Sequence, residues 1–181
     1  MTADRGAGWR LRAATVADVA AMQALEVDAG RRFREVGMDA IADDAPPHAD
    51  LLAEHIAAGT AWVVVGDDDR PLGYALASTV DGEGHLDQVS VALDAGRRGI
   101  GTALIERVCA WAREHGMRSV TLTTFRDVGF NGPYYRSVGF TDVDDDSCGP
   151  ELAAIRRRER AAGIEVAPRV AMRRRLTDAP E

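Results

Sequence analysis

The turn VALDAGRRGIGTAL, which ends at Leu104, places three glycines and two arginines between a strand-type and a helix-type segment. The residues before it alternate as in a strand, and residues 103–115 carry Leu104, Val108 and Trp111 on one stripe of a helix. Residues 119–124, which follow, have strong β propensity. Two strands joined by a glycine turn and one helix are most simply parallel neighbours with a right-handed crossover. The chain is therefore predicted to contain a parallel strand pair.

Strand-type and helix-type segments account for most of the remaining sequence. Strands are predicted at residues 9–12, 60–65, 72–80, 85–91, 139–143 and 169–176. Helices are predicted after the N-cap residue Thr15, over residues 51–56, around 133–137 and over 151–160. Residues 29–48 are less regular and are expected to form a charged connection, either a substrate-facing loop or a solvated loop. The basic run at residues 156–160 is interpreted as a solvated helix face.

Length and charge limit the classes of protein that this chain can represent. The 181 residues are enough for one domain with a core, so residues 1–181 are expected to form a single domain. Residues 1–8 and 177–181 are expected to be flexible ends. The formal net charge of -7 disfavours binding to nucleic acid, because duplex binding depends on neutralising phosphates with Lys and Arg. The same charge favours a cationic substrate through weak long-range steering.

Apolar runs and cysteines exclude further classes. Residues 1–11 lack the apolar core of a signal peptide, and no apolar run approaches the ~20 residues of a membrane span, so a cytoplasmic protein is predicted. The two cysteines, Cys109 and Cys148, form neither a disulfide framework nor a metal-binding pattern, and no metal is expected. Cys109 lies among apolar helix positions and is interpreted as a core residue.

The glycine turn differs from two well-known phosphate-binding loops. Its glycines are spaced differently from those of the dinucleotide fingerprint, and the Lys-Ser/Thr pair of a Walker loop is missing. Glycines nevertheless let the backbone approach an anion closely, and the helix that follows points its free amides and positive dipole end into the turn. Arg97 and Arg98 add charge-assisted hydrogen-bond donors. Together these groups suit a pyrophosphate.

Two groups of residues resemble the signatures of the GCN5-related N-acetyltransferase (GNAT) family. The first signature of that family is a strand that ends in Val, a short gap, and Gln/Arg-x-x-Gly-x-Gly/Ala at the start of a helix. Val91 and the segment GIGTAL at residues 99–104 fit this signature in place and order. Asn131 and the segment YRSVGF at residues 135–140 fit the second signature, which contains Tyr-x-x-x-Gly-Phe.

The resemblance spans nearly the whole chain. Residues 11–18 are similar to the first strand and helix of the family, and residues 169–172 are similar to its last strand. The resemblance implies an α/β (α+β) chain with the GNAT fold. That fold is a mixed, mostly antiparallel central sheet of about six to seven strands with a splayed parallel pair, flanked by about four helices.

The resemblance also implies an enzyme, an N-acetyltransferase that uses acetyl-CoA as its co-substrate. The amine attacks the acetyl group directly, so the site needs a base for the ammonium, a donor for the tetrahedral oxyanion and an acid for the CoA thiolate. The oxyanion donor that the resemblance implies is a backbone N–H of residues 89–91. The implied cofactor-binding residues are Val89, Ser90, Val91, Arg97, Arg98, Gly99, Ile100, Gly101, Thr102, Asn131 and Tyr135.

Three residues are candidates for the catalytic groups. Tyr135 matches the tyrosine of the family and is the implied acid, although a packing role is the ordinary alternative. His85 and Asp87 share one face of a predicted strand, at places where relatives carry their base, and either one is a candidate. The ordinary alternatives are a strand-edge histidine and a solvated carboxylate. Carboxylates that can instead bind the cation of the substrate or act through water are Glu26, Asp28 and Asp39.

The first signature departs from the family at two positions. Gly96 stands where the family usually has Gln or Arg, and Leu93 stands where Pro is common. Because Arg97 and Arg98 follow directly, one of these two side chains is expected to take over the missing phosphate contact.

The sequence leaves the acceptor open. We expect a primary amine of a small molecule, and the alternative is a protein lysine or N-terminus, which a flat and open mouth favours. A non-catalytic acyl-CoA-binding module is the alternative of another class; Gly96 favours it and Tyr135 argues against it. The expected partners are a small-molecule or peptide amine and, because dimers are frequent in the family, a second copy of the chain, with no nucleic acid and no membrane.

Overall fold

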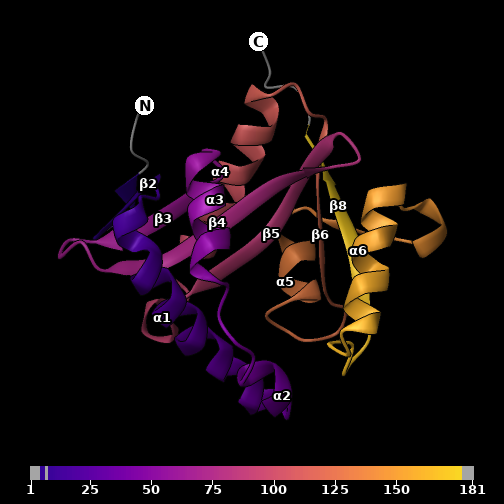
Figure 1. Ribbon diagram of the computed structural model, residues 1–181, viewed down its shortest axis with the longest axis horizontal. Helices are drawn as coiled ribbons and strands as arrows, with labels where there is room; N and C mark the ends of the chain where they lie inside the picture. Colours follow the sequence, from indigo (N-terminus) through magenta and orange to yellow (C-terminus); the bar gives the residue numbers. More distant parts are fainter. Residues whose placement is uncertain (1–4, 7, 177–181) are drawn as a thin grey trace. The chain divides into compact units, whose positions relative to one another are not determined.

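The computed structural model of the chain describes residues 5–6 and 8–176 (Figure 1). Its strands are β1 (Arg5–Gly6), β2 (Trp9–Ala13), β3 (Ala61–Gly66), β4 (Pro71–Val80), β5 (Glu83–Val91), β6 (Ser119–Phe125), β7 (Thr141–Val143) and β8 (Arg169–Arg175). Its helices are α1 (Val19–Gly30), α2 (Asp39–Ala42), α3 (Ala49–Ala57), α4 (Ile100–Glu114), α5 (Gly132–Ser137) and α6 (Pro150–Ala161). Short 3-10 helices are η1 (Val16–Asp18), η2 (Arg31–Val36), η3 (Leu93–Ala95) and η4 (Asp145–Ser147).

The strands are hydrogen-bonded in the order β1-β2-β3-β4-β5-β6-β8-β7. β5 and β6 run parallel, whereas β2, β3 and β4 form an antiparallel series and β8 is antiparallel to both β6 and β7. Apart from the two-residue strand β1, this is a mixed sheet of seven strands, and α1, α3, α4 and α6 are its four longest helices. The predicted fold class, including the parallel pair around the glycine turn, is confirmed.

Two compact units are present in the chain. Unit 1 holds residues up to 77 together with 88–107, and unit 2 holds residues 78–87 together with those from 108 on. The single domain over residues 1–181 stays a prediction, as do its flexible ends, of which residues 1–4, 7 and 177–181 lie outside the described residues. In the described part of the chain, no helix combines the length and the apolar character that crossing a bilayer requires.

Unit 1 is built around β3, in which every residue is buried. β3 pairs with β2 on one side and with β4 on the other, and α1 and α3 pack against each other (Figure 1). The carboxylate of Asp18, the residue before α1, accepts hydrogen bonds from the two terminal guanidinium nitrogens of Arg12 on β2, at 2.8 and 2.9 Å. These bonds are the main reason why the pKa of Asp18 falls to about 2.

A glycine outside the signature turn seats the first turn of α4 on the sheet of unit 1. A Cβ atom on Gly73 would lie 2.9 Å from Cγ2 of Ile100 and 3.0 Å from the carbonyl oxygen of Ser90. Real Cβ atoms essentially never approach other atoms this closely, so any other residue at position 73 would force Ile100 of α4 or the backbone of β5 to shift. Gly73 therefore helps to position the helix that follows the glycine turn.

Unit 2 contains the parallel pair and the C-terminal strands. Gly84 pairs with Val120 and His85 with Thr121, and β6 pairs with β8 along its whole length. α6 lies along β8 (Figure 1), where Leu152 joins a buried apolar cluster with Ala171. α4 runs from unit 1 into unit 2, and Cys109 in its second half is fully buried, as predicted for a core residue.

The start of α6 is held by the turn between β4 and β5. The carboxylate of Asp81 accepts hydrogen bonds from the backbone N–H groups of Glu151 and Leu152, at 2.9 and 3.0 Å. The carboxylate of Glu151 in return accepts from the backbone N–H of Asp81. This is the reciprocal arrangement of a capping box, but its two partners are 70 residues apart in the sequence.

Residues 29–48 differ from the irregular connection that the sequence predicts. α1 continues to Gly30, and η2 and α2 follow in the same stretch. Met38 and Ala42 are buried, and a Cβ atom on Gly30 would lie 3.3 Å from the carbonyl oxygen of Ala42. Although the segment is rich in charged residues, its two buried residues, Met38 and Ala42, allow it to fold back onto the end of α1.

The interpretation of residues 156–160 as a solvated helix face is wrong for Arg156, which is only 3% exposed. Its guanidinium donates to Oε2 of Glu159 at 2.7 Å and to Oε1 of Glu165 at 3.1 Å. Glu159 also pairs with Arg169 of β8 at 2.9 Å. Arg156 follows Leu152 by one helical turn, so it faces the sheet, and its charge is compensated by carboxylates that lie further along the sequence.

Candidate active site

The glycine turn in unit 1 joins β5 to α4. β5 ends at Val91, η3 follows, and α4 begins at Ile100, three residues earlier than predicted. Gly99 has a φ angle of +78°, in the left-handed region, and Arg97 has a φ angle of +60°. Left-handed backbone is unfavourable for a residue with a Cβ atom, so Arg97 is a strained position within the turn. The turn keeps this geometry because surrounding contacts determine it.

Contacts with three other elements brace the turn. The guanidinium of Arg70, from the β3–β4 connection, pairs with Asp94 at 3.0 Å. The guanidinium of Arg98 donates to the carbonyl oxygen of Gly8 at 3.3 Å, and the indole of Trp9 donates back to the carbonyl oxygen of Arg98 at 3.3 Å. The carboxylate of Asp28, at the end of α1, accepts from the backbone N–H of Leu93 at 3.0 Å. Asp28 is thus a structural residue of this turn.

The predicted residues Ile100, Gly101 and Thr102 form the first turn of α4. The first N–H groups of a helix have no carbonyl in the same helix to which they can donate, and they carry the positive end of the helix dipole. The first backbone bond of α4 runs from the N–H of Ala103 to the carbonyl oxygen of Gly99 at 2.9 Å. The amides at positions 100–102 therefore have the orientation of an anion-binding helix start.

In unit 1, three neutral side chains donate hydrogen bonds to one carboxylate, Glu26, an arrangement that the sequence does not reveal. Glu26 of α1 accepts hydrogen bonds from the hydroxyl of Tyr74 at 2.7 Å, from the hydroxyl of Ser90 at 2.5 Å and from the amide of Gln88 at 2.8 Å. Burial, and then the charge of Glu26, raises the pKa of Tyr74 far above its ordinary value. Ser90, predicted at the cofactor, thus has its side chain directed to Glu26.

The remaining predicted cofactor residues of β5, Val89 and Val91, are half-buried and flank Ser90 on the strand. Side chains alternate along a strand, so Val89 and Val91 point to the face opposite to Ser90. Glu26, one of the alternative carboxylates for the substrate, uses its oxygens for three neutral donors within unit 1. Asp39, another of these carboxylates, lies on α2 beside Arg34 at 3.9 Å.

His85 lies in unit 2 and is 3% exposed. Its Nδ1 atom lies 2.8 Å from the hydroxyl oxygen of Thr121, and that hydroxyl lies 3.3 Å from the carbonyl oxygen of Gly84. Because a carbonyl only accepts, the Thr121 hydroxyl can donate to Gly84 while it accepts a hydrogen bond from Nδ1–H of His85. This tautomer leaves the lone pair on Nε2. Burial lowers the pKa of His85 although the charge of Asp87 opposes the shift, so the neutral form dominates at pH 7.

Asp87 has a different environment from His85, although the two residues lie on the same strand. Its side chain is exposed, and its carboxylate accepts a hydrogen bond from the hydroxyl of Ser78 at 2.9 Å. The alternative of a strand-edge histidine does not hold for His85, because β5 lies between β4 and β6 in the sheet.

Tyr135 lies on α5 in unit 2 and is 9% exposed. Its ring packs edge-on against Phe140 at a centroid distance of 5.8 Å and tilted against Tyr134 at 5.5 Å. Burial raises the pKa of Tyr135 above its ordinary value, so the hydroxyl keeps its proton at neutral pH. Both the packing and the protonated state are compatible with a positioned acid.

Asn131 immediately precedes α5, and its side-chain amide donates to the hydroxyl of Thr124 on β6 at 3.0 Å. The other side-chain atom, Oδ1, is buried, and no hydrogen-bond partner reaches it within residues 8–176. The next residue must be glycine, since a Cβ atom on Gly132 would lie 2.1 Å from the carbonyl oxygen of Arg126. The chain therefore holds Asn131 tightly while one buried acceptor stays unsatisfied, which costs about 1–3 kcal/mol.

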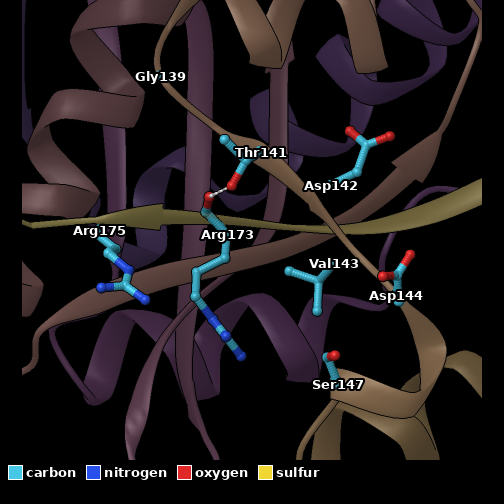
Figure 2. Close-up of a pocket in the computed structure, with 8 residues that line it drawn as sticks. All are labelled: Gly139, Thr141, Asp142, Val143, Asp144, Ser147, Arg173 and Arg175. Atoms are coloured by element: carbon cyan, nitrogen blue, oxygen red, sulfur yellow. Dashed lines mark hydrogen bonds between the residues drawn. The ribbon is translucent and has the colours of Figure 1, made fainter.

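A cavity of about 480 Å³ in unit 2 is lined by residues of β7, of β8 and of the segments that flank β7 (Figure 2). The hydroxyl of Thr141 donates to the carbonyl oxygen of Arg173 in its wall, at 3.2 Å. The residues that line it are Gly139, Thr141, Asp142, Val143, Asp144, Ser147, Arg173 and Arg175. None of the predicted site residues is among them. Within the described residues, no three His, Cys, Asp or Glu side chains gather as metal ligands do.

Comparison with known protein families agrees with the signature residues. The sequence model of the acetyltransferase (GNAT) family matches residues 21–140, which include β5, the glycine turn, α4, β6 and α5. The chain therefore belongs to the GNAT acetyltransferase family. Membership in this family implies that the chain is an N-acetyltransferase, as the sequence predicts.

Solved structures share the fold at low sequence identity. The N-acetylglutamate synthase of Neisseria gonorrhoeae, in complex with coenzyme A and N-acetyl-glutamate, superposes with a TM-score of 0.72 at 20% identity over 96% of this chain. This chain spans only 36% of that synthase. The PaiA N-acetyltransferase of Thermoplasma acidophilum, in complex with coenzyme A, has a TM-score of 0.65 at 12% identity over 93% of this chain and 99% of its own. The ribosomal-protein-S18-alanine N-acetyltransferase of Escherichia coli has a TM-score of 0.65 at 15% identity, over 96% of this chain and 97% of its own.

Proposed function

We propose that this chain transfers an acetyl group from acetyl-CoA to the primary amine of a small molecule. The observation that carries the proposal is the glycine turn of unit 1, in which arginines adjoin the start of a 15-residue helix. A turn of this kind presents backbone amides and positive charge to a pyrophosphate. The solved relatives that contain coenzyme A support the same cofactor.

The unsatisfied carbonyl oxygen of Asn131 supports a ligand in unit 2. A buried acceptor is normally hydrogen-bonded, and a donor on the bound molecule would remove the cost of leaving it unpaired. The pantetheine arm of CoA carries two amide N–H groups of this kind. We assign Asn131 to that arm, and the amides of residues 100–102 to the pyrophosphate.

In the proposed reaction the amine nitrogen attacks the thioester carbonyl, the C–S bond breaks, and the thiolate leaves. A backbone N–H within residues 89–91 stabilises the oxyanion. Tyr135 protonates the leaving thiolate and regains a proton that the nitrogen releases as the amide forms, a role that fits a buried tyrosine whose hydroxyl keeps its proton. His85 takes a proton from the incoming ammonium at Nε2, because burial keeps its imidazole neutral. Asp87, exposed and two residues away, attracts the cationic acceptor.

A small acceptor is the first choice because the chain is acidic, with a formal net charge of -7, which favours cationic amines. A protein lysine or N-terminus is the alternative, and the relatives include both kinds of enzyme: an N-acetylglutamate synthase and an enzyme that acetylates ribosomal protein S18.

Two measurements test the proposal. Acetyl-CoA should raise the melting temperature of the protein, because a ligand that binds only the folded state stabilises it. Release of free CoA should then appear with at least one member of a panel of polyamines, amino acids and peptides. Absence of a melting shift at millimolar acetyl-CoA would overturn the cofactor assignment, and turnover with peptides alone would replace the small-molecule acceptor by a protein.

A further inference from the structure

Gly96 is not required by its backbone conformation. Its φ and ψ angles are −59° and 154°, values that any residue adopts. A Cβ atom at this position would meet only two atoms, at 3.5 and 3.6 Å, which are ordinary van der Waals distances. The absence of a side chain at the first position of the glycine turn therefore needs another explanation.

The nearer of those two atoms is Nη2 of Arg32, 3.5 Å from the position of the missing Cβ. Arg32 lies on η2, which continues directly from α1, and is 64 residues earlier in the sequence than Gly96. A long side chain at position 96 would start against this guanidinium. Arg32 thus occupies the space beside the glycine turn into which a side chain at position 96 would extend.

The segment that carries Arg32 is fixed on both sides within unit 1. Before it, the carboxylate of Asp28 accepts from the backbone N–H of Leu93 at 3.0 Å, which ties the end of α1 to η3. After it, Ala42 of α2 packs with its carbonyl oxygen against Gly30 at the end of α1. The backbone segment that carries Arg32 is therefore anchored beside η3, and its guanidinium lies 3.5 Å from the place where a side chain at position 96 would begin.

We propose that Arg32 is the phosphate-binding cation that replaces the missing side chain at position 96. The proposal rests on the proposed function, because it assigns Arg32 to the pyrophosphate of acetyl-CoA. Of the two arginines inside the turn, Arg98 donates to the carbonyl oxygen of Gly8, and Arg97 occupies a strained backbone position. A guanidinium supplied by η2 reaches the turn without adding strain to it and offers a fork of donors to a phosphate.

The test compares binding of CoA and of pantetheine, which lacks the pyrophosphate, to the wild-type chain and to Arg32→Ala by calorimetry. The Kd for CoA should rise about 10- to 100-fold, the range expected for one charge-assisted hydrogen-bonded contact. The Kd for pantetheine should stay within a factor of two. Arg31→Ala is the matched control: Arg31 precedes Arg32, is exposed and pairs with Asp28 at 3.5 Å, so its loss should leave both Kd values unchanged.

A second substitution tests whether side chains at positions 32 and 96 bind the same phosphate. In the Arg32→Ala chain, an arginine at position 96 (Gly96→Arg) has both space and a compatible backbone conformation. This double variant should bind CoA at least tenfold more tightly than Arg32→Ala alone. Equal weakening of CoA and pantetheine in Arg32→Ala would make Arg32 a structural residue and overturn the inference. So would an unchanged Kd for CoA in Arg32→Ala, or no recovery in the double variant. Failure of the wild-type chain to bind CoA would instead refute the proposed function itself.

Discussion

The residues assigned to function in unit 1 and those assigned in unit 2 differ in their chemistry. In unit 1 the groups assigned to the cofactor are backbone amides and arginines at a glycine turn, and the neighbouring acidic residues Asp28 and Asp94 are engaged in bracing that turn. In unit 2 the assigned groups, His85 and Tyr135, are buried side chains whose pKa values are shifted by loss of solvation. We propose that fixed donors of unit 1 bind the anion and that desolvated titratable groups of unit 2 move protons, whereas Asn131 of unit 2 binds the cofactor arm.

The largest effect is expected at Tyr135. Tyr135→Phe removes the proposed acid but keeps the ring that packs against Phe140, so kcat should fall about 10²- to 10⁴-fold. The Kd for acetyl-CoA and the midpoint of urea unfolding should change little. Steady-state kinetics with the best acceptor of the panel measure the effect. An unchanged kcat would remove Tyr135 from the chemistry and break the division between the two units.

Substitution of Arg156 should lower the stability of the chain and leave cofactor binding intact. Arg156→Ala removes the buried guanidinium that donates to Glu159 and Glu165, which keep Arg169 and Arg160, and should cost about 2–3 kcal/mol in the free energy of unfolding. Arg157→Ala, at the exposed neighbouring position, should stay within about 0.5 kcal/mol. Urea unfolding of both variants checks this, and CoA binding by the folded fraction of Arg156→Ala should match that of the wild type.

Substitutions of His85 and of Asp87 should change the pH–rate profile in different ways. The pKa of His85 is lowered in the folded chain, so the neutral base is lost only as the pH falls through a value below the ordinary 6.5. His85→Gln should lower kcat about 10²-fold at pH 7 and remove the corresponding limb of the pH–rate profile. Asp87→Asn should keep that limb and mainly raise KM for a cationic acceptor. If Asp87→Asn removes the limb and His85→Gln keeps it, the roles are exchanged.

The same pKa shift has a consequence for stability. The unfolded chain binds a proton at position 85 at a higher pH than the folded chain, so stability rises with pH in this range. The contribution of His85 to the free energy of unfolding should therefore be fully present above about pH 6.5. It should decline as the pH falls below this value, until His85 of the folded chain is protonated as well. His85→Gln should flatten this part of the curve of unfolding midpoint against pH, and an unaltered slope would show that other groups cause it.

The smallest effect is expected at Arg97. Arg97→Gly relieves a residue held at a φ angle of +60° and should stabilise the chain by about 1 kcal/mol. If its guanidinium contributes to the pyrophosphate, the same substitution weakens CoA binding, so stability and affinity change in opposite directions. Thermal unfolding and calorimetry on one preparation measure both. A rise in affinity would mean that the backbone of the turn, and not this charge, limits binding.

Local patterns in the sequence were sufficient for the fold class and the family. The alternation before Val91, the apolar stripe of Leu104, Val108 and Trp111, and the β-branched residues 119–124 each act over a few neighbours, so they predict the strand, helix and strand correctly. The glycine turn and Tyr135 could be found in the same way because their signatures have a fixed spacing.

What the tertiary structure decided depends on contacts between residues far apart in the sequence. Arg32 beside Gly96, Glu26 beneath Ser90, and Asp81 at the start of α6 have no local signal, since partners 64 or more residues apart leave no periodic pattern. Burial is decided in the same way. His85 and Asp87 have the same position in the strand pattern, but the surroundings of His85 exclude water and those of Asp87 do not. The sequence determined which chemical groups are available, whereas the packing around each group determined its charge and its neighbours.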